Sequence, residues 1–357
     1  MKKILHMCEF SAKVKGNFIE SLEYLSRFDN EVEHIYLFPN EARYTGAKMW
    51  IDELNSKREC AYIQEDSFVK NVFLLKKIIK KHNITYIIRH FTNYKNDVIL
   101  KLVFNSKKVI RFFHMMYVTE NECPIKHFIR TLLWKNNHFV GVSNAVSNAL
   151  KTKFKNCSVF TIENAIHFER LKNNDEFSRL DKISLLMMGY DISVKGVDLA
   201  LTIAEKLKSE YNIVLYIVVV ANLNQVTEYI VQRYGKVPEW VILLPPTQNI
   251  ATYYNNIDIF LSPSRTEACP CAVVEAAWCN KSVVASKVGG QAELKIDGVY
   301  WFESENIDEF YKQTRLAIEE LKSDEKIAEK ELARQKIEKY YALDRWCQDI
   351  TTLINNL

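Results

Sequence analysis

Two glutamates with seven residues between them, Glu267 and Glu275, mark the stretch whose residue types suggest chemistry. A buried strand is expected over 258–261, a polar loop over 262–269, and a helix over 272–278 with Pro270 in its first turn. Free N–H groups at such a helix start bind anions, phosphates above all. A carboxylate does not help to bind a phosphate, so both glutamates are better suited to accept hydrogen bonds from sugar hydroxyls.

The two glutamates also have structural alternatives. Glu267 would then cap the helix, and Glu275 would form a structural ion pair. For Glu275 we disfavour this alternative, because the apolar residues 273–274 and 276–277 predict a mostly buried helix. A buried acid there needs a partner.

Residues 263–293 contain the pattern Pro-Ser-x-x-Glu…Glu-Ala…Val-Val-Ala-Ser-x-x-Gly-Gly-x-x-Glu, which resembles family 4 of the retaining GT-B glycosyltransferases. The resemblance covers nearly the whole chain and is strongest over 183–293. It implies an α/β fold, GT-B, with two Rossmann-like domains facing a central cleft. It also implies transfer of a sugar from a nucleoside diphosphate sugar, which is a substrate and not a cofactor. No divalent metal is required by this interpretation, because the sequence has no Asp-x-Asp motif.

The order of the expected elements supports two domains. A strand at 3–8, a helix at 17–27 and a strand at 33–38 form a Rossmann-like opening. We predict an N-terminal acceptor-side domain over 1–167, onto which a C-terminal helix at 341–357 packs back. A nucleotide-sugar-binding domain is predicted over 168–340, with the polar segment 168–182 as the linker. Further strands are expected over 84–88, 109–113, 139–143, 159–162, 213–221, 241–244 and 282–286, and further helices over 68–82, 144–151, 308–321 and 324–340.

Three residues are expected to carry the chemistry, on the strength of the resemblance. Lys195, in Lys-Gly, matches the lysine that neutralises the donor diphosphate. Glu267 would hold the hydroxyls of the sugar. His114, in Arg-Phe-Phe-His at a strand end, matches a histidine beside the transferred sugar, and His90 is the rival candidate. The structural alternative for His114 is a satisfied histidine or a helix cap.

The resemblance also implies the donor contacts. Glu275 is expected at the ribose, and Thr247 lies where the family holds the nucleotide base by backbone. Tyr190 stands where the family has an arginine, so Arg265 is a candidate for a replacement charge. Gly16 is the one glycine left in a first loop that is glycine-rich in the family. The predicted donor contacts are Glu275, Gly16, Gly189, Arg265, Ala268, Cys269, Cys271 and Thr247.

Composition bounds the class of protein. The chain has 357 residues, 48% of them hydrophobic and 26% charged, as in soluble globular proteins of two domains. No apolar run approaches the roughly 20 residues that span a bilayer, and the opening residues are too quickly polar for a signal peptide. Eight cysteines occur without a Cys-x-x-Cys pair, as expected of reduced thiols. We therefore expect a cytoplasmic protein, or a peripheral one at the inner face of the membrane.

Charge is divided unevenly along the chain. Residues 1–170 hold 27 Lys and Arg against 17 Asp and Glu, whereas the remainder holds 21 against 27. The predicted helix over 68–82 contains Lys70, Lys76, Lys77, Lys80 and Lys81. It is either an ordinary packed helix with a solvated basic face or a contact with an anionic membrane surface. Nucleic acid is not an expected partner, because no motif for it is present.

The sequence therefore predicts a retaining hexosyltransferase. The expected acceptor is a saccharide or a lipid-linked saccharide in the synthesis of bacterial surface polysaccharide, such as capsule, lipopolysaccharide or exopolysaccharide. The alternative is a non-catalytic GT-B-like binding partner. The missing arginine and the glycine-poor first loop favour the alternative, whereas Lys195 and both glutamates argue against it.

Overall fold

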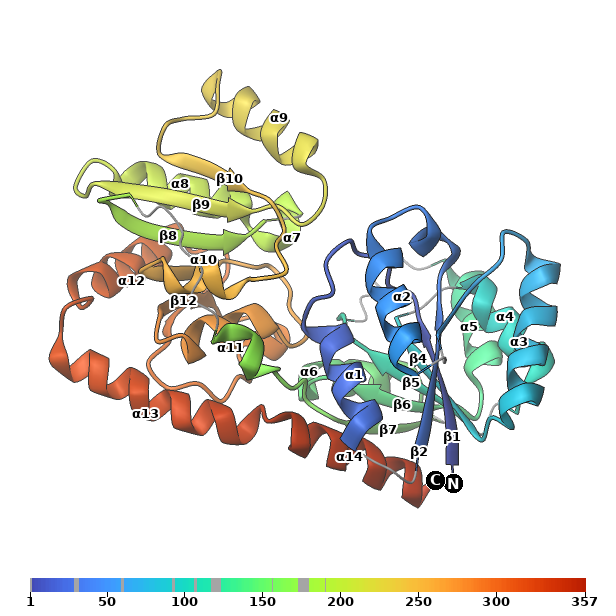
Figure 1. The fold of residues 1–357 in the computed structure, drawn as a ribbon. Coiled ribbons are helices and arrows are strands. Elements are labelled where there is room, and N and C mark those ends of the chain that lie inside the picture. Colours follow the sequence, from blue (N-terminus) through green and yellow to red (C-terminus); the bar gives the residue numbers. More distant parts are fainter. Residues whose placement is uncertain are drawn as a thin grey trace. The chain divides into compact units, whose positions relative to one another are not determined.

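The computed structural model divides the chain into two compact units, each with its own parallel sheet (Figure 1). Unit 1 comprises Met1–Asn164 and Leu343–Leu357, and unit 2 comprises Ala165–Ala342. The structure describes residues 2–28, 32–58, 61–91, 94–105, 108–116, 123–155, 157–172, 180–189 and 191–357. Tyr190 and residues 173–179 of the predicted linker lie outside the described residues.

The described part of unit 1 has a seven-stranded sheet with the order β3-β2-β1-β4-β5-β6-β7. Every pairing in it is parallel. The strands are β1 (Lys2–Cys8), β2 (Val32–Phe38), β3 (Ala61–Ile63), β4 (Tyr86–His90), β5 (Val109–Phe113), β6 (His138–Gly141) and β7 (Ser158–Thr161). The helices are α1 (Asn17–Phe28), α2 (Ala47–Arg58), α3 (Phe68–His82), α4 (Tyr94–Val103), α5 (Pro124–Trp134), α6 (Asn144–Lys153) and α14 (Leu343–Asn356).

Helix α3 shows how local sequence sets the elements of unit 1. The Ser67 side chain accepts a hydrogen bond from the Lys70 N–H at 3.2 Å and caps the helix start. Asn83 ends the helix in the left-handed conformation, with φ 52°. Leu75 and Ile78 are buried in a core cluster with β1, β2 and α4. The lysines of α3 are left on its outer side.

Two arginines on neighbouring strands of unit 1 are almost fully buried. Arg89 is 0% exposed and Arg111 is 2% exposed. Asp97 lies between them, 2.7 Å from Arg111 Nη1 and 3.3 Å from Arg89 Nη2, and it accepts a hydrogen bond from Trp134 Nε1 at 2.8 Å. Glu9 lies 3.2 Å from Arg89 Nη1. Burial lowers the pKa of Arg111 to about 10, so the cation is tolerated only because Asp97 is its partner.

Unit 2 is a second parallel α/β layer structure, and its described residues form a six-stranded sheet with the order β10-β9-β8-β11-β12-β13. The strands are β8 (Ile183–Met188), β9 (Ile213–Val218), β10 (Val241–Leu244), β11 (Ile259–Ser262), β12 (Ser282–Ser286) and β13 (Tyr300–Phe302). The helices are α7 (Ile192–Lys195), α8 (Val197–Leu207), α9 (Leu223–Tyr234), α10 (Ala251–Asn255), α11 (Cys271–Trp278), α12 (Ile307–Glu319) and α13 (Asp324–Tyr340).

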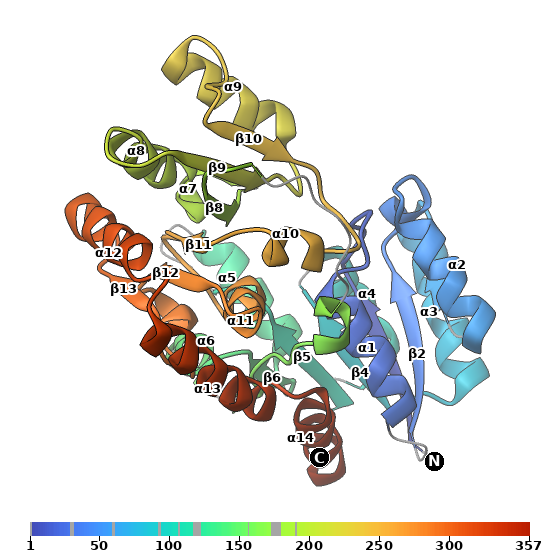
Figure 2. The ribbon, with the colours of Figure 1, turned by 60° about the vertical axis from the view of Figure 1, so that its left-hand side comes forward.

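Both faces of the unit 2 sheet are covered, which explains its nearly continuous apolar strands. Leu185 and Met187 of β8 belong to a core cluster with α8 and α12. The alternate residue Leu186 belongs to a second cluster with α10, α11 and α13 on the other face (Figure 2). The carboxyl ends of β8 and β11 therefore lead into loops at one edge of the sheet, where ligands of such folds bind.

The predicted fold class is confirmed, since both units are Rossmann-like parallel α/β structures. The bounds of 68–82, 109–113, 241–244, 282–286 and 324–340 were predicted as the structure has them. Helix α11 begins at Cys271, so Pro270 is its N-cap residue and not part of its first turn. Of the helices that the structure describes, none combines the length and the apolar content needed to cross a membrane.

The buried arginines generate a stability prediction. Asp97→Asn keeps the shape of the side chain but removes the charge that faces Arg89 and Arg111. We expect a loss of about 3–5 kcal/mol in the free energy of unfolding of unit 1. Urea denaturation followed by circular dichroism measures this loss. The matched control Asp52→Asn, on the exposed side of α2, should change stability by less than about 0.5 kcal/mol. Equal effects of the two substitutions would contradict the role of Asp97.

Candidate active site

Lys195 is placed by the glycine that follows it. Gly196 ends α7 with φ 68°, a conformation that favours glycine. A Cβ atom on Gly196 would lie 2.1 Å from the Pro263 carbonyl oxygen, so the backbone approaches this loop as only glycine allows. The Asp191 side chain caps the same short helix by accepting from the Val194 N–H at 2.8 Å. Lys195 is thereby held against the loop that follows β11.

That loop brings Glu267 to Lys195. The Lys195 Nζ atom lies 2.6 Å from Glu267 Oε1, and the two side chains are 13% and 11% exposed. The Ser264 hydroxyl donates to the same carboxylate oxygen at 2.7 Å. Two of the three predicted catalytic residues therefore form one ion pair, although 72 positions separate them. Sequence reasoning assigned them separate ligand groups and did not predict that they would bind each other.

Residues behind the loop fix its shape. Gln291 is 0% exposed and its amide donates to the carbonyls of Ser262 at 3.1 Å and Ser286 at 2.7 Å. The Ser286 hydroxyl donates to the Ser264 carbonyl at 2.6 Å. Sequence reasoning did not single out Gln291 or Ser286. The available signal was the position of Gln291, directly after the glycine pair in the motif.

A small pocket of about 170 Å³ opens beside the ion pair. Lys195 and Glu267 line it together with Pro270, Cys271 and Ala272 at the start of α11. The N–H groups that open a helix point away from its body, an arrangement that suits a phosphate. The pocket therefore joins a cation, a carboxylate and anion-binding N–H groups at the carboxyl edge of the sheet.

Arg265, the candidate for a replacement charge, is bound to two carboxylates in the structure, and its role at the donor stays a prediction. Its guanidinium binds both oxygens of Asp198, at 2.9 and 2.7 Å, and also pairs with Glu305. It donates to the Ser193 carbonyl at 2.6 Å as well. The hydrogen bonds to Asp198 and Glu305 raise the pKa of the Arg265 guanidinium above its usual value. Arg265 therefore fastens the loop to α7 and α8, and two carboxylates neutralise its charge.

Glu275 has the structural partner that the sequence analysis disfavoured. Arg170 Nη1 lies 2.7 Å from Glu275 Oε1, and the Tyr254 hydroxyl donates to Oε2 at 2.9 Å. Glu275 is 5% exposed, and burial together with the nearby Glu275 charge raises the pKa of Tyr254 well above the usual value. The expectation that Glu275 forms no structural ion pair was wrong. Arg170, 105 positions away, gives no local signal in the sequence.

The other predicted donor contacts lie at several places in the fold. A Cβ atom on Gly189 would lie 2.4 Å from Ile217 Cγ2, so this glycine permits close packing at the end of β8. Thr247 accepts from the Asn249 N–H at 3.1 Å within its own turn. Gly16 precedes α1 in unit 1 with φ 27°. Ala268 is buried, and Cys269 and Cys271 are half-buried around the start of α11.

His114 and its rival His90 are bonded to each other in unit 1. His90 Nδ1 lies 3.1 Å from His114 Nε2. His90 is 0% exposed, whereas His114 is half-buried just after β5. Desolvation lowers the pKa of His114 to about 4, so its ring is neutral at pH 7. Of the two residues, His114 is the less buried.

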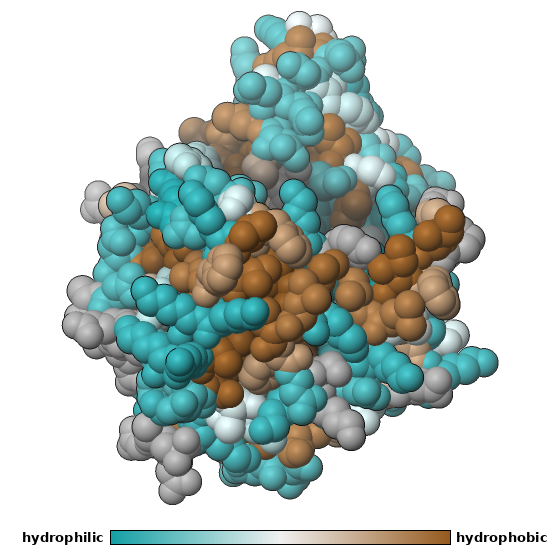
Figure 3. Space-filling model, turned by 90° about the vertical axis from the view of Figure 1, so that its right-hand side faces the viewer, coloured by the Kyte–Doolittle hydropathy of each residue, from teal (hydrophilic) through white to brown (hydrophobic). Residues whose placement is uncertain are grey.

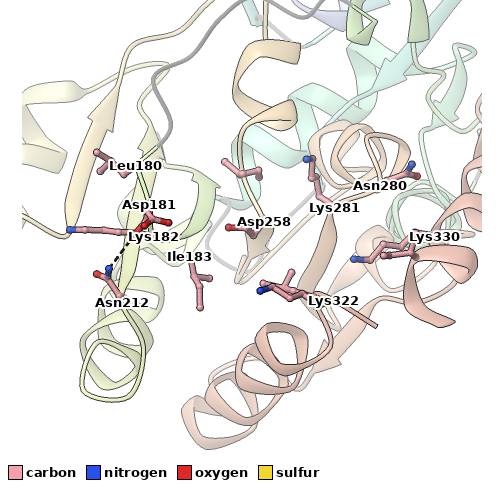
Figure 4. Close-up of a pocket in the computed structure, with 13 residues that line it drawn as sticks. Leu180, Asp181, Lys182, Ile183, Asn212, Asp258, Asn280, Lys281, Lys322 and Lys330 are labelled. Atoms are coloured by element: carbon pink, nitrogen blue, oxygen red, sulfur yellow. Dashed lines mark hydrogen bonds between the residues drawn. The ribbon is translucent and has the colours of Figure 1, made fainter. Parts of the chain in front are cut away.

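A larger pocket of about 820 Å³ lies at the opposite edge of the unit 2 sheet, near the amino ends of the strands. Figure 4 shows Lys322 and Lys330 on one side of it and Asp181 with Lys182 on the other. None of the predicted site residues lines this pocket. Within the described ranges, no three His, Cys, Asp or Glu side chains gather as a metal site would require.

Comparisons with known proteins connect this geometry to a class. Residues 169–334, slightly under half of the chain, match the sequence model of the family described as glycosyl transferases group 1. The chain resembles the solved structure of HepE from Anabaena in complex with UDP and glucose, with a TM-score of 0.79, 14% identity and 100% coverage of both chains. The fold is therefore that of the GT-B glycosyltransferases.

Two curated relatives point the same way. An uncharacterised glycosyltransferase of Methanocaldococcus jannaschii is 22% identical over 185 residues, 51% of this chain and 49% of that protein. One subunit of human phosphatidylinositol N-acetylglucosaminyltransferase is 26% identical over 235 residues, 62% of this chain and 47% of that protein. The matched part spans about half the length of these relatives. These relatives, like the family model over residues 169–334, are described as glycosyltransferases.

The close approach at Gly196 generates a test of how the site is built. Gly196→Ala adds a left-handed alanine, which costs about 1–2 kcal/mol, and a collision with Pro263 that costs about 1–3 kcal/mol more. Gly235→Ala is the matched control, because Gly235 has φ 78° and a Cβ atom there meets nothing within 4 Å. Denaturant unfolding of both variants measures the difference. Equal losses in the free energy of unfolding would mean that the loop around Pro263 moves aside for the new methyl group without a measurable cost.

Proposed function

We propose that the protein is a glycosyltransferase that moves a sugar from a nucleoside diphosphate sugar to a saccharide or lipid-linked acceptor with retention at the anomeric carbon. The observation that carries this proposal is the Lys195–Glu267 pair beside the start of α11, inside the region that matches the family. HepE, which has the same fold, was solved with UDP and glucose, and this supports a nucleotide sugar as the donor.

The arrangement suits departure of a diphosphate. When the bond from the anomeric carbon to the diphosphate oxygen breaks, its electron pair leaves with the phosphate. Lys195 and the N–H groups at the start of α11 stabilise that negative charge. Glu267 accepts hydrogen bonds from the hydroxyls of the sugar. This chemistry needs stabilisation of the leaving group more than a strong base, and no metal ion is invoked for it.

The roles of Glu275 and His114 are carried over from the resemblance. Under the proposal, Glu275 accepts hydrogen bonds from the ribose, and it does so while bound to Arg170 and Tyr254. His114 is the contribution of unit 1 to the transferred sugar. A place in the assembly of bacterial surface polysaccharide is proposed from the resemblance. The name of the human relative, which includes phosphatidylinositol, supports a lipid among the acceptors.

One experiment separates this function from a non-catalytic binding partner. The protein is incubated with a panel of uridine and guanosine diphosphate sugars in EDTA, and both donor hydrolysis and the shift in melting temperature are measured. A transferase hydrolyses its donor slowly and is stabilised by it, because a ligand that binds only the folded state adds stability. A binding partner shows the shift without hydrolysis. Neither response to any donor would overturn the proposal, and turnover that needs added Mn²⁺ or Mg²⁺ would overturn its metal-free form.

An anionic membrane surface is proposed as a second partner, through unit 1. The side chains of Leu75 and Ile78 are buried, so the apolar stripe of α3 belongs to the core. Val69 and Phe73 of α3, however, are 61% and 67% exposed. Helix α4 packs between α3 and α5, and exposed apolar side chains continue across all three. Figure 3 shows apolar side chains gathered on this side of the molecule, with hydrophilic ones between them.

The charge of Lys195 is the sharpest test of the proposed chemistry. Lys195→Ala should lower kcat for the identified donor by about 10²-fold or more, because it removes a charge that stabilises the departing diphosphate. Lys206→Ala is the control and should keep wild-type rates, since Lys206 is exposed on α8, where it pairs with Asp308 and lies over the Tyr311 ring. A loss of less than about threefold for Lys195→Ala would show that another group holds the diphosphate.

The membrane proposal predicts salt-sensitive binding to vesicles that contain anionic lipid. Each lysine near such a surface adds about 1 kcal/mol, so a variant with four lysines of α3 changed to glutamine should sediment far less with vesicles at low salt. The four positions are Lys76, Lys77, Lys80 and Lys81.

A control variant removes four exposed lysines of unit 2, and its sedimentation should stay close to wild type. The control positions are Lys206, Lys287, Lys312 and Lys336. A second variant, Phe73→Ser, keeps every charge and tests insertion of the apolar side chains. If the wild type and the α3 lysine variant sediment equally with the vesicles, the proposal of an anionic membrane as a partner is wrong.

A further inference from the structure

Four histidines of unit 1 form one continuous chain of ring contacts. His34 Nδ1 lies 2.8 Å from His6 Nε2, His6 Nδ1 lies 3.0 Å from His90 Nε2, and His90 Nδ1 lies 3.1 Å from His114 Nε2. The successive ring centroids are 5.1, 5.3 and 5.3 Å apart, which is close to each nitrogen–nitrogen distance plus the radii of the two rings. Each contact therefore runs nearly along the line between the ring centres, in the planes of both rings, as an imidazole hydrogen bond requires. We call these residues the histidine chain.

The register of the sheet produces this chain. Ile4 of β1 pairs with His34 of β2, so His6 lies one strand over and two residues further along. His90 pairs with Cys8, and His114 follows Phe112, which pairs with His90. Each step therefore moves one strand across and two residues toward the carboxyl edge. Because side chains alternate with a period of two, the rings share one face of the sheet. The chain climbs diagonally over four neighbouring strands and ends at His114.

The contacts restrict which proton arrangements are allowed. A neutral imidazole has one N–H and one bare nitrogen, and each link needs one of each. Every link joins an Nδ1 to an Nε2. Consequently, if one ring is the Nδ1–H tautomer, its neighbours must be Nδ1–H as well, and the same holds for Nε2–H. A mixed chain places two N–H groups or two lone pairs against each other.

We infer that the four imidazoles change tautomer as one unit, so that His34, His6 and His90 together set whether His114 Nδ1 donates or accepts a hydrogen bond. These three are positioning residues, since they act through His114. The link to catalysis rests on the proposed function, in which His114 contacts the transferred sugar. The coupling of the four tautomers follows from the contacts alone.

Burial keeps His6, His90 and His114 neutral, and neutral rings in contact are coupled. His34 is 5% exposed, and His6 and His90 are 0% exposed. Desolvation holds the pKa of His6 and of His90 well below the usual value, with smaller contributions from the neighbouring rings and, at His90, from Arg89. Water does not compete for the nitrogens that form these links, so a mismatched link is costly. The one end that remains half-open is His114.

The test reads the tautomer of each ring in the full chain. Protein labelled with ¹⁵N-histidine is examined by long-range proton–nitrogen correlation NMR at pH 7, where the two ring nitrogen shifts identify the tautomer. We expect one common tautomer for His6, His34, His90 and His114 in the wild type. A mixture of tautomers among these four rings would overturn the inference, and this measurement needs no variant.

Two substitutions at the far end should drive His114 in opposite directions. His34→Asp places a carboxylate oxygen where Nδ1 stood, which accepts from His6 Nε2–H and should bring His114 to the Nε2–H form. His34→Leu removes the partner of His6 Nε2. A bare nitrogen is tolerated there better than an unpaired N–H, so His114 should take the Nδ1–H form. The same tautomer at His114 in both variants would overturn the coupling.

His82→Asp is the matched control. His82 also lies in unit 1 and is 9% exposed, but it contacts Tyr62 at 2.8 Å and Glu33 at 3.5 Å, away from the histidine chain. The His82→Asp substitution should leave the two ring nitrogen shifts of His114 unchanged.

Activity adds a separate readout. With an accepted donor, the two His34 variants should differ from each other in kcat by about tenfold, the effect of one hydrogen bond, with a similar KM for the donor. Equal kcat values for the two His34 variants would show that the tautomer of the histidine chain does not affect catalysis. Absence of turnover in the wild type would overturn the proposed function and leave the tautomer result to stand by itself.

Discussion

The ion pair between Lys195 and Glu267 is the interaction on which the candidate site depends. A lysine and a glutamate that are each little more than a tenth exposed would lose much of their hydration, and the short contact between them offsets this loss. The pair forms only because Gly196 lets the backbone meet the Pro263 carbonyl. Gln291 and Ser286 then hold the loop from behind. The site is thus a rigid loop supported by buried amide and hydroxyl groups.

The sheet of unit 1 carries buried polar groups on both faces, and the two faces satisfy them differently. Along β4, Arg89 lies between Ile88 and His90, so it faces the side opposite to the histidine chain. Charged groups there are neutralised by Asp97 and Glu9. On the other face, burial keeps His6, His90 and His114 neutral, and the rings of the histidine chain supply donors and acceptors to one another. A sheet that is apolar in composition therefore contains one ionic network and one neutral network.

The sequence predicted the fold well because its signals are local. Ser67 and Asn83 bracket α3, and the motif around Glu267 fixes a strand, a loop and a helix by short spacings. Long-range partners were the failures. Arg170 was not connected to Glu275, and no pattern along the chain indicated that Asp198 and Glu305 bind Arg265, the candidate for a replacement charge. Such pairings depend on how loops fold across a sheet, which residue patterns along the chain do not specify.

The histidines show the same limit more sharply. Sequence reasoning selected His114 and His90 as competing candidates because each ends a predicted strand. The structure makes them neighbours in one chain, and which of the two contacts the transferred sugar stays a prediction. The histidine chain requires the strand order β2-β1-β4-β5. It also requires that each next histidine lies two residues closer to the carboxyl edge of the sheet than the one before. A shift of one residue in any pairing would send a ring to the other face of the sheet.

Under the proposed function, donor binding must rearrange the ion pair. Lys195 is bound to Glu267, and the same lysine is assigned to the diphosphate. When the diphosphate takes over the lysine, Glu267 Oε1 keeps the Ser264 hydroxyl, and the position that the lysine held on this oxygen becomes available to a hydroxyl of the sugar. A diphosphate without a sugar would take the lysine and leave the largely buried charge of Glu267 without its cation, which costs free energy. The pair therefore favours a complete nucleotide sugar over its diphosphate product, and it links recognition of the two halves of the donor through one shared contact.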